Sequence, residues 1–115
     1  MRLAGKYPNV TARLADQNMA VSAIVVLEVL GYHKLQAGEK AELENLFSKL
    51  VVLYPYYEIF QLAINLRQIR KISIGDALIA VTAIHEKIPL ATHNVTDFSW
   101  IDGLSIIDPL KQDVL

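Results

Sequence analysis

Apolar and polar positions alternate along the chain in blocks whose spacing predicts short strands followed by helices. In the block 39–50, Leu43, Leu46 and Phe47 recur at the spacing of one helix face. The middle of the block 73–86 is apolar nearly all round, which indicates a helix buried on several sides. Helices are predicted over residues 8–16, 24–34, 39–50, 56–70 and 73–86, with a single turn beginning at Asn94.

Short apolar segments between these helices are typical of buried strands. The predicted strands cover residues 19–23, 51–54, 90–92 and 104–107. Strands that alternate with helices favour an α/β fold with a parallel sheet. A chain of 115 residues is long enough to bury one modest core, so we expect a single domain over residues 1–115.

The composition excludes several classes of protein. Apolar residues make up 53% of the chain and charged residues 20%, which argues against intrinsic disorder. The net charge of −1 excludes binding of nucleic acid by bulk attraction, so a polyanion would need a local basic patch. The absence of cysteine excludes disulfides and thiolate zinc sites and suits the cytoplasm, where we expect the protein. The longest apolar run, 19–30, is too short to span a membrane, and we expect no membrane partner.

Three acidic residues stand at unusual positions in this pattern. Glu28 is the only charge between Asp16 and Lys34, and an unpaired buried carboxylate there would be costly. The alternative to a functional role is that Glu28 lies on the solvent-facing stripe of its helix, near Tyr32. Asp76 follows Ser73 by three residues, and the two form a possible capping box. Asp97 stands in the same relation to Asn94, so helix capping explains either aspartate when it is considered alone.

Considered together, the three acids predict a metal site. In a parallel sheet, the carboxyl ends of the strands and the starts of the following helices share one edge, where ligands bind. Glu28 and Asp97 each follow a predicted strand, and Asp76 opens a helix that leads into another strand. Carboxylates that gather there would repel one another unless a cation holds them. Mg²⁺ or Mn²⁺, which prefer oxygen ligands, are the expected cofactors, and phosphodiester hydrolysis is a reaction they support.

Three sequence blocks resemble the PIN-domain family, specifically its VapC-type ribonuclease toxins. The blocks are Ser22–Glu28 (SAIVVLE), Ile74–Ala80 (IGDALIA) and Leu90–Phe98 (LATHNVTDF), and the tail after Ile101 is also similar. The resemblance implies a three-layer α/β/α fold and a metal-dependent endoribonuclease of a toxin–antitoxin pair. It further implies that Glu28, Asp76 and Asp97 are catalytic metal ligands, and that an RNA substrate and a cognate antitoxin are partners. Supporting polar roles fall to Ser22, Thr92 and Asn94.

One family feature is not found in this sequence. The family begins with an apolar strand that ends in an Asp-Thr-Asn-like motif and supplies the first acid. Residues 1–6 contain no acid, and Asp16-Gln17-Asn18 has no apolar strand before it. We therefore expect a PIN-like sheet without its first, central strand, and weak or absent activity in this exact chain. The exposed strand edges and apolar helices that this leaves predict a homodimer or a higher oligomer.

Basic residues offer a second kind of contact. Arg67, Arg70 and Lys71 share one helix face, where they either bind RNA phosphates or form a solvated helix end. His93 lies beside the predicted site and is a further candidate for a nucleic-acid contact. Two other functions stay open from the sequence. One is a non-catalytic PIN remnant that dimerises or binds an antitoxin, and the other is an interaction domain whose acids only cap helices.

Overall fold

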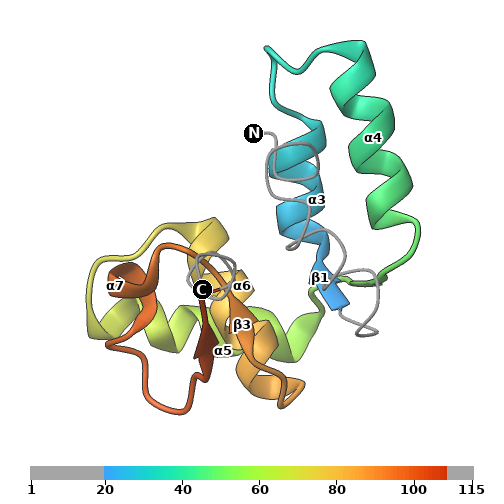
Figure 1. Ribbon diagram of the computed structural model, residues 1–115. Helices are drawn as coiled ribbons and strands as arrows, with labels where there is room; N and C mark the ends of the chain where they lie inside the picture. The colour runs from blue at the N-terminus through green and yellow to red at the C-terminus, as the bar shows by residue number, and fades with distance from the viewer. Residues whose placement is uncertain (1–19, 109–115) are drawn as a thin grey trace. The chain divides into compact units, whose positions relative to one another are not determined.

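The computed structural model of the chain describes residues 20–108 (Figure 1). The chain divides at Tyr54 into two compact units, which we call unit 1 (residues 1–54) and unit 2 (residues 55–115). The expectation of one domain stays a prediction. The helix expected at 8–16 and the Asp16-Gln17-Asn18 motif lie outside the described residues.

The described part of unit 1 contains two strands that pair directly and two helices that connect them along the chain. Its elements are β1 (Ala20–Ser22), α3 (Ala23–Leu30), α4 (Ala37–Phe47) and β2 (Val51–Leu53). The strands are parallel, and the register places Ala20 opposite Val51 and Ser22 opposite Leu53. Val29 of α3 and the α4 residues Leu43 and Leu46 are buried, as the helical spacing of the leucines predicts.

The boundaries of both helices in unit 1 differ from the prediction, which placed them at 24–34 and 39–50. The helix predicted over 24–34 ends at Leu30, and Gly31 is its C-cap. A Cβ atom at Gly31 would lie 2.5 Å from the Leu27 carbonyl oxygen, so this close approach requires glycine. The helix predicted from Glu39 begins at Ala37 instead. Glu39 accepts a hydrogen bond from the Gln36 N–H at 3.2 Å, and this capping box starts the helix ahead of Gly38.

Unit 2 is built on two long helices that pack side by side (Figure 1). They are α5 (Tyr57–Ile69) and α6 (Ile74–His85), followed by β3 (Leu90–Ala91), α7 (Val95–Phe98) and β4 (Ile106–Ile107). Ile59 of α5 is completely buried, and every residue of α6 from 77 to 83 is buried. This confirms the prediction that the 73–86 helix is covered on several sides.

The buried stretch of α6 includes one polar residue, Thr82. Its hydroxyl donates a hydrogen bond to the Leu78 carbonyl oxygen at 2.6 Å, so its burial leaves no unsatisfied donor. Within residues 20–108, no helix is both long and apolar enough to cross a membrane.

Both strand pairs of the described chain are parallel. In unit 2, Leu90 pairs with Ile106 and Ala91 with Ile107. The prediction of an α/β fold with parallel strands is therefore confirmed. The strands from 20 to 108 form two separate pairs, β1–β2 and β3–β4.

Candidate metal and nucleic-acid site

Glu28 lies on α3, the helix that follows β1. Ser22 caps this helix, since its hydroxyl oxygen accepts a hydrogen bond from the Ile24 N–H at 3.1 Å. At the rise of an α-helix, Glu28 stands about 7.5 Å beyond Ala23 along the helix axis. Its side chain is exposed, and so is Tyr32 one turn later, as the solvent-facing alternative expects. Glu28 is therefore not a buried, unpaired carboxylate, and its position carries no desolvation cost.

Asp76 stands in the first turn of α6, and only one of the two hydrogen bonds of the expected capping box is formed. The Ser73 hydroxyl oxygen accepts a hydrogen bond from the Asp76 N–H at 3.1 Å. No bond returns from the Asp76 carboxylate, which makes no hydrogen bond or ion pair within the described chain. Ser73 thus caps the helix, whereas the half-buried Asp76 carboxylate is left available to a ligand.

The segment that joins β3 to α7 carries Asp97 and its neighbours. The capping role expected of the Asn94 side chain is wrong, because it makes no capping hydrogen bond. Thr92 acts here instead: its hydroxyl oxygen accepts a hydrogen bond from the Asn94 N–H at 3.0 Å and bends the chain into α7. Asp97 is exposed, and among the described residues only its backbone forms hydrogen bonds. Its N–H donates to the Asn94 carbonyl oxygen at 3.1 Å, and its carbonyl oxygen accepts from the Trp100 indole N–H at 2.9 Å.

The three predicted metal ligands therefore share one property: their carboxylates have no protein partner among the residues that the structure describes. Glu28 belongs to unit 1, and Asp76 and Asp97 belong to unit 2. Within neither unit do three His, Asp or Glu side chains of the described chain form a group that could hold a metal ion. The convergence of the three acids stays a prediction.

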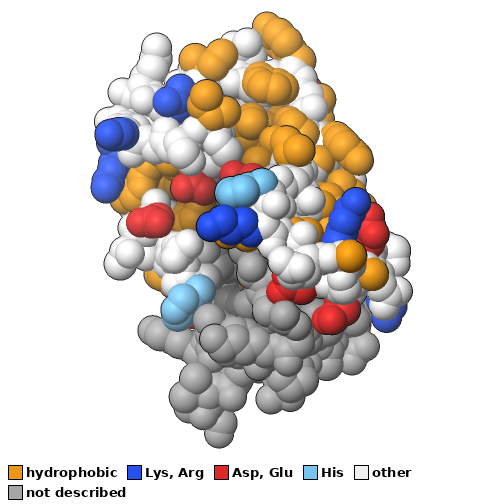
Figure 2. Space-filling model, turned by 90° about the horizontal axis from the view of Figure 1, so that it is seen from above, with side chains coloured by type: hydrophobic (Ala, Val, Ile, Leu, Met, Phe, Trp, Pro, Cys, Tyr) orange, Lys and Arg blue, Asp and Glu red, His pale blue; other side chains and the backbone are white. Residues whose placement is uncertain are grey.

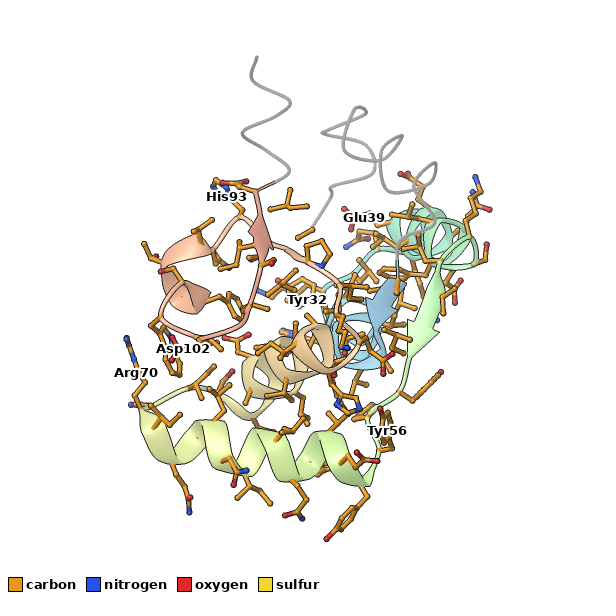
Figure 3. The ribbon with its side chains drawn as sticks, turned by 90° about the horizontal axis from the view of Figure 1, so that it is seen from below. Tyr32, Glu39, Tyr56, Arg70, His93 and Asp102 are labelled. Carbon is orange, nitrogen blue, oxygen red and sulfur yellow. The ribbon has the colours of Figure 1, made fainter. Side chains whose placement is uncertain are left out.

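The prediction that Arg67, Arg70 and Lys71 share one helix face is wrong, because α5 ends at Ile69 and the backbone is extended at Arg70. Two of these basic side chains also make contacts inside unit 2. The Arg67 guanidinium donates from Nε to the Ile72 carbonyl oxygen at 3.0 Å and so holds the turn between α5 and α6. Arg70 stacks over the Trp100 ring, with 4.7 Å between its Cζ atom and the ring centroid. Figure 3 shows Arg70 at the end of α5 with its side chain directed outward. Lys71 is exposed beside it. The cluster therefore combines structural contacts with positive charge at the surface.

His93 has a partner that the sequence analysis missed. Its Nδ1 lies 3.3 Å from both carboxylate oxygens of Asp108. Asp108 follows β4 as His93 follows β3, and parallel pairing brings the two strand ends together. An acid directly after the last predicted strand was the available signal.

A model of the PIN domain family matches residues 7–104. Among solved structures, a toxin–antitoxin complex from Klebsiella pneumoniae is 26% identical, with a TM-score of 0.69 and coverage of 86% of this chain and 83% of that one. VapBC2 from Rickettsia felis, solved bound to a DNA fragment from its promoter, is 27% identical, with a TM-score of 0.72 and coverage of 88% and 83%. Curated proteins gave no match.

Proposed function

The chain belongs to the PIN domain family, and from this premise we propose that it is a divalent-metal-dependent endoribonuclease of the VapC toxin type. The observation that carries the proposal is the family match over residues 7–104, which includes Glu28, Asp76 and Asp97. The similarity to two toxin–antitoxin structures supports the same assignment.

In this proposal the three carboxylates hold one Mg²⁺ or Mn²⁺ ion. Unpaired carboxylate oxygens are the donors that these cations prefer, and the three acids have no competing protein partner in the described chain. When bound, the ion supplies Lewis acidity at a phosphodiester. Thr92 shapes the segment that presents Asp97, and Ser22 and Ser73 fix the helices that carry Glu28 and Asp76.

Substrate contacts would come from the basic side chains of unit 2. Arg70 and Lys71 place positive charge at the end of α5, and Arg67 leaves its terminal guanidinium nitrogens beyond the Nε bond to Ile72. Arginine and lysine contacts to phosphate oxygens provide affinity that is independent of sequence. A local patch of this kind is what a chain of net charge −1 requires for RNA.

The test is cleavage of a labelled single-stranded RNA with Mn²⁺, with Mg²⁺ and with EDTA. We expect weak cleavage that requires the metal and that Glu28→Gln abolishes. Glu42→Gln is the matched control, since Glu42 is an exposed acid of α4 with no described partner. Cleavage that survives EDTA, or that Glu28→Gln leaves at the level of Glu42→Gln, would refute the proposal.

An antitoxin is the proposed protein partner, and it also supports a second candidate function. Both similar structures are toxin–antitoxin complexes. A chain that binds such a partner without cutting RNA would be a non-catalytic PIN module. Retained binding of the protein encoded beside its gene, together with no metal-dependent cleavage, would favour this module over the enzyme.

Self-association is proposed from the exposed apolar surface of unit 2. Tyr57, Phe60 and Ile64 lie on one face of α5 and are exposed by half or more. Phe60 and Ile64 also line a groove of about 530 Å³ that α5 forms with α6. Hydrophobic side chains are visible at the surface in Figure 2. Sedimentation should show a dimer or higher oligomer, and Phe60→Ser should reduce its stability; a monomer at high concentration would contradict this.

A further inference from the structure

The paired strands of unit 2 bring two side chains that are far apart in sequence to one edge. The β3–β4 ladder continues past its last paired residues, because the Thr92 N–H donates to the Ile107 carbonyl oxygen at 2.9 Å. His93 follows Thr92 on one strand, and Asp108 follows Ile107 on the other. Their position is therefore fixed by backbone hydrogen bonds, at the carboxyl edge where parallel sheets bind ligands.

The pair is unequally exposed. The His93 side chain is 66% exposed, whereas that of Asp108 is only 9% exposed. An ionised carboxylate only accepts hydrogen bonds, so the proton between them belongs to His93 Nδ1. Asp108 thus binds Nδ1 of the His93 ring and leaves Nε2 available to a ligand. Figure 3 shows the His93 ring at the end of its strand, on the side of unit 2 away from α5.

The backbone after His93 connects this pair to a predicted metal ligand. The Thr92 hydroxyl and the Asn94 N–H close a tight bend around His93, and α7 begins directly afterwards with Asp97 in its first turn. His93 therefore stands between β3 and the helix that carries Asp97.

We infer that Asp108 is a positioning residue, which orients His93 so that its Nε2–H donates to a backbone phosphate of bound RNA. A protonated imidazole donates from both nitrogens, to the Asp108 carboxylate on one side and to a phosphate oxygen on the other. The inference rests on the proposed ribonuclease function for the identity of the ligand. It adds Asp108 and a specific atom of His93 to the predicted substrate contacts.

The test is binding of a fluorescein-labelled single-stranded RNA in EDTA at pH 6. His93→Gln should weaken binding about fivefold to tenfold. It should also reduce the slope of log affinity against log salt by about 0.7, the value for one phosphate contact on a single strand. His33→Gln, an exposed histidine of unit 1, is the control and should change neither quantity.

A double-mutant cycle tests the positioning role. Asp108→Asn should weaken binding on its own but should add nothing when His93 is already Gln, because its effect passes through the ring. Equal losses in both backgrounds, or no loss in His93→Gln, would overturn the inference. A side-chain ¹⁵N spectrum of the unsubstituted protein is a second measurement, and a neutral His93 protonated on Nε2 rather than Nδ1 would also overturn it.

The inference and the proposed function fail in different ways. Suppose that cleavage requires the metal and is abolished by Glu28→Gln, but that His93→Gln leaves the RNA affinity unchanged. This result would overturn the inference and support the proposed function. The absence of RNA binding in EDTA would overturn the inference too, and the separate cleavage assay with Mn²⁺ then decides the function.

Discussion

Ser73 and Asp76 share the start of α6 but are predicted to do different things. The Ser73 hydroxyl stabilises the helix by accepting the Asp76 N–H, whereas the Asp76 carboxylate has no partner in the described chain. Replacing Ser73 by Ala should therefore destabilise the fold and leave the metal site intact. Replacing Asp76 by Asn should abolish the metal site and destabilise the fold less, because it retains the shape of the side chain and removes only its charge.

The expected free energies separate the two roles. Loss of an N-cap hydroxyl costs about 1 kcal/mol of the free energy of unfolding. Loss of the Asp76 charge at the helix N-terminus costs about 0.3–1 kcal/mol without metal. A ligand present at a hundred times its dissociation constant stabilises the folded state by about 2.7 kcal/mol. This gain with Mn²⁺ should appear in the unsubstituted protein and in Ser73→Ala and disappear in Asp76→Asn.

Urea unfolding followed by circular dichroism, with and without saturating Mn²⁺, measures all of these quantities. Asp102→Asn serves as the control, since Asp102 is an exposed aspartate of unit 2 outside the predicted site. An equal gain in stability from Mn²⁺ in Asp76→Asn and in Asp102→Asn would refute the assignment of Asp76 as a ligand. An unchanged stability in Ser73→Ala would refute the capping role.

Three further predictions concern unit 2. Ile59→Ala should cost about 2–5 kcal/mol in urea unfolding and Ile59→Val about 0.5–1.5, since Ile59 is fully buried; equal losses would contradict this. Partial desolvation raises the pKa of Tyr56 above its ordinary value of 10.0, and so do the hydrogen bond to Glu86 and the Glu86 charge. The neutral Tyr56 therefore stabilises the folded state fully below pH 10, and this contribution is lost as pH rises beyond it. Tyr56→Phe should reduce that alkaline loss, and an unchanged pH profile would refute it. Arg67→Ala should destabilise by about 1 kcal/mol without RNA, and a similar loss in the control Lys71→Ala would refute the structural contact.

The order and type of the elements were predictable from the sequence because hydrophobic spacing records which face is buried. The α6 helix shows this well, since its apolar middle is buried from 77 to 83. Helix ends were less predictable because they depend on local hydrogen bonds. The helix predicted over 39–50 begins at Ala37, because the capping box between Gln36 and Glu39 starts it earlier.

The chemistry of the site was predictable in type and less so in detail. Asp76 and Asp97 stand at helix starts, as predicted, because the acids and the apolar pattern lie in the same short blocks. Thr92, rather than Asn94, supplies the side-chain bond at the start of α7. Asp108 was missed, because its contact with His93 spans 15 residues and depends on strand register. The position of Asp108 directly after the last predicted strand is a local signal, but only the strand register identifies His93 as its partner.

The central claim is that Glu28, Asp76 and Asp97 gather around one divalent cation. Paramagnetic broadening of backbone amide signals by substoichiometric Mn²⁺ tests it most directly, because the ion broadens only the signals of residues near it. The account predicts that the amides of all three acids broaden together, while those of Glu42 and Glu44 on α4 stay sharp. Broadening at Asp76 and Asp97 without Glu28, or equal broadening at every exposed acid, would contradict it.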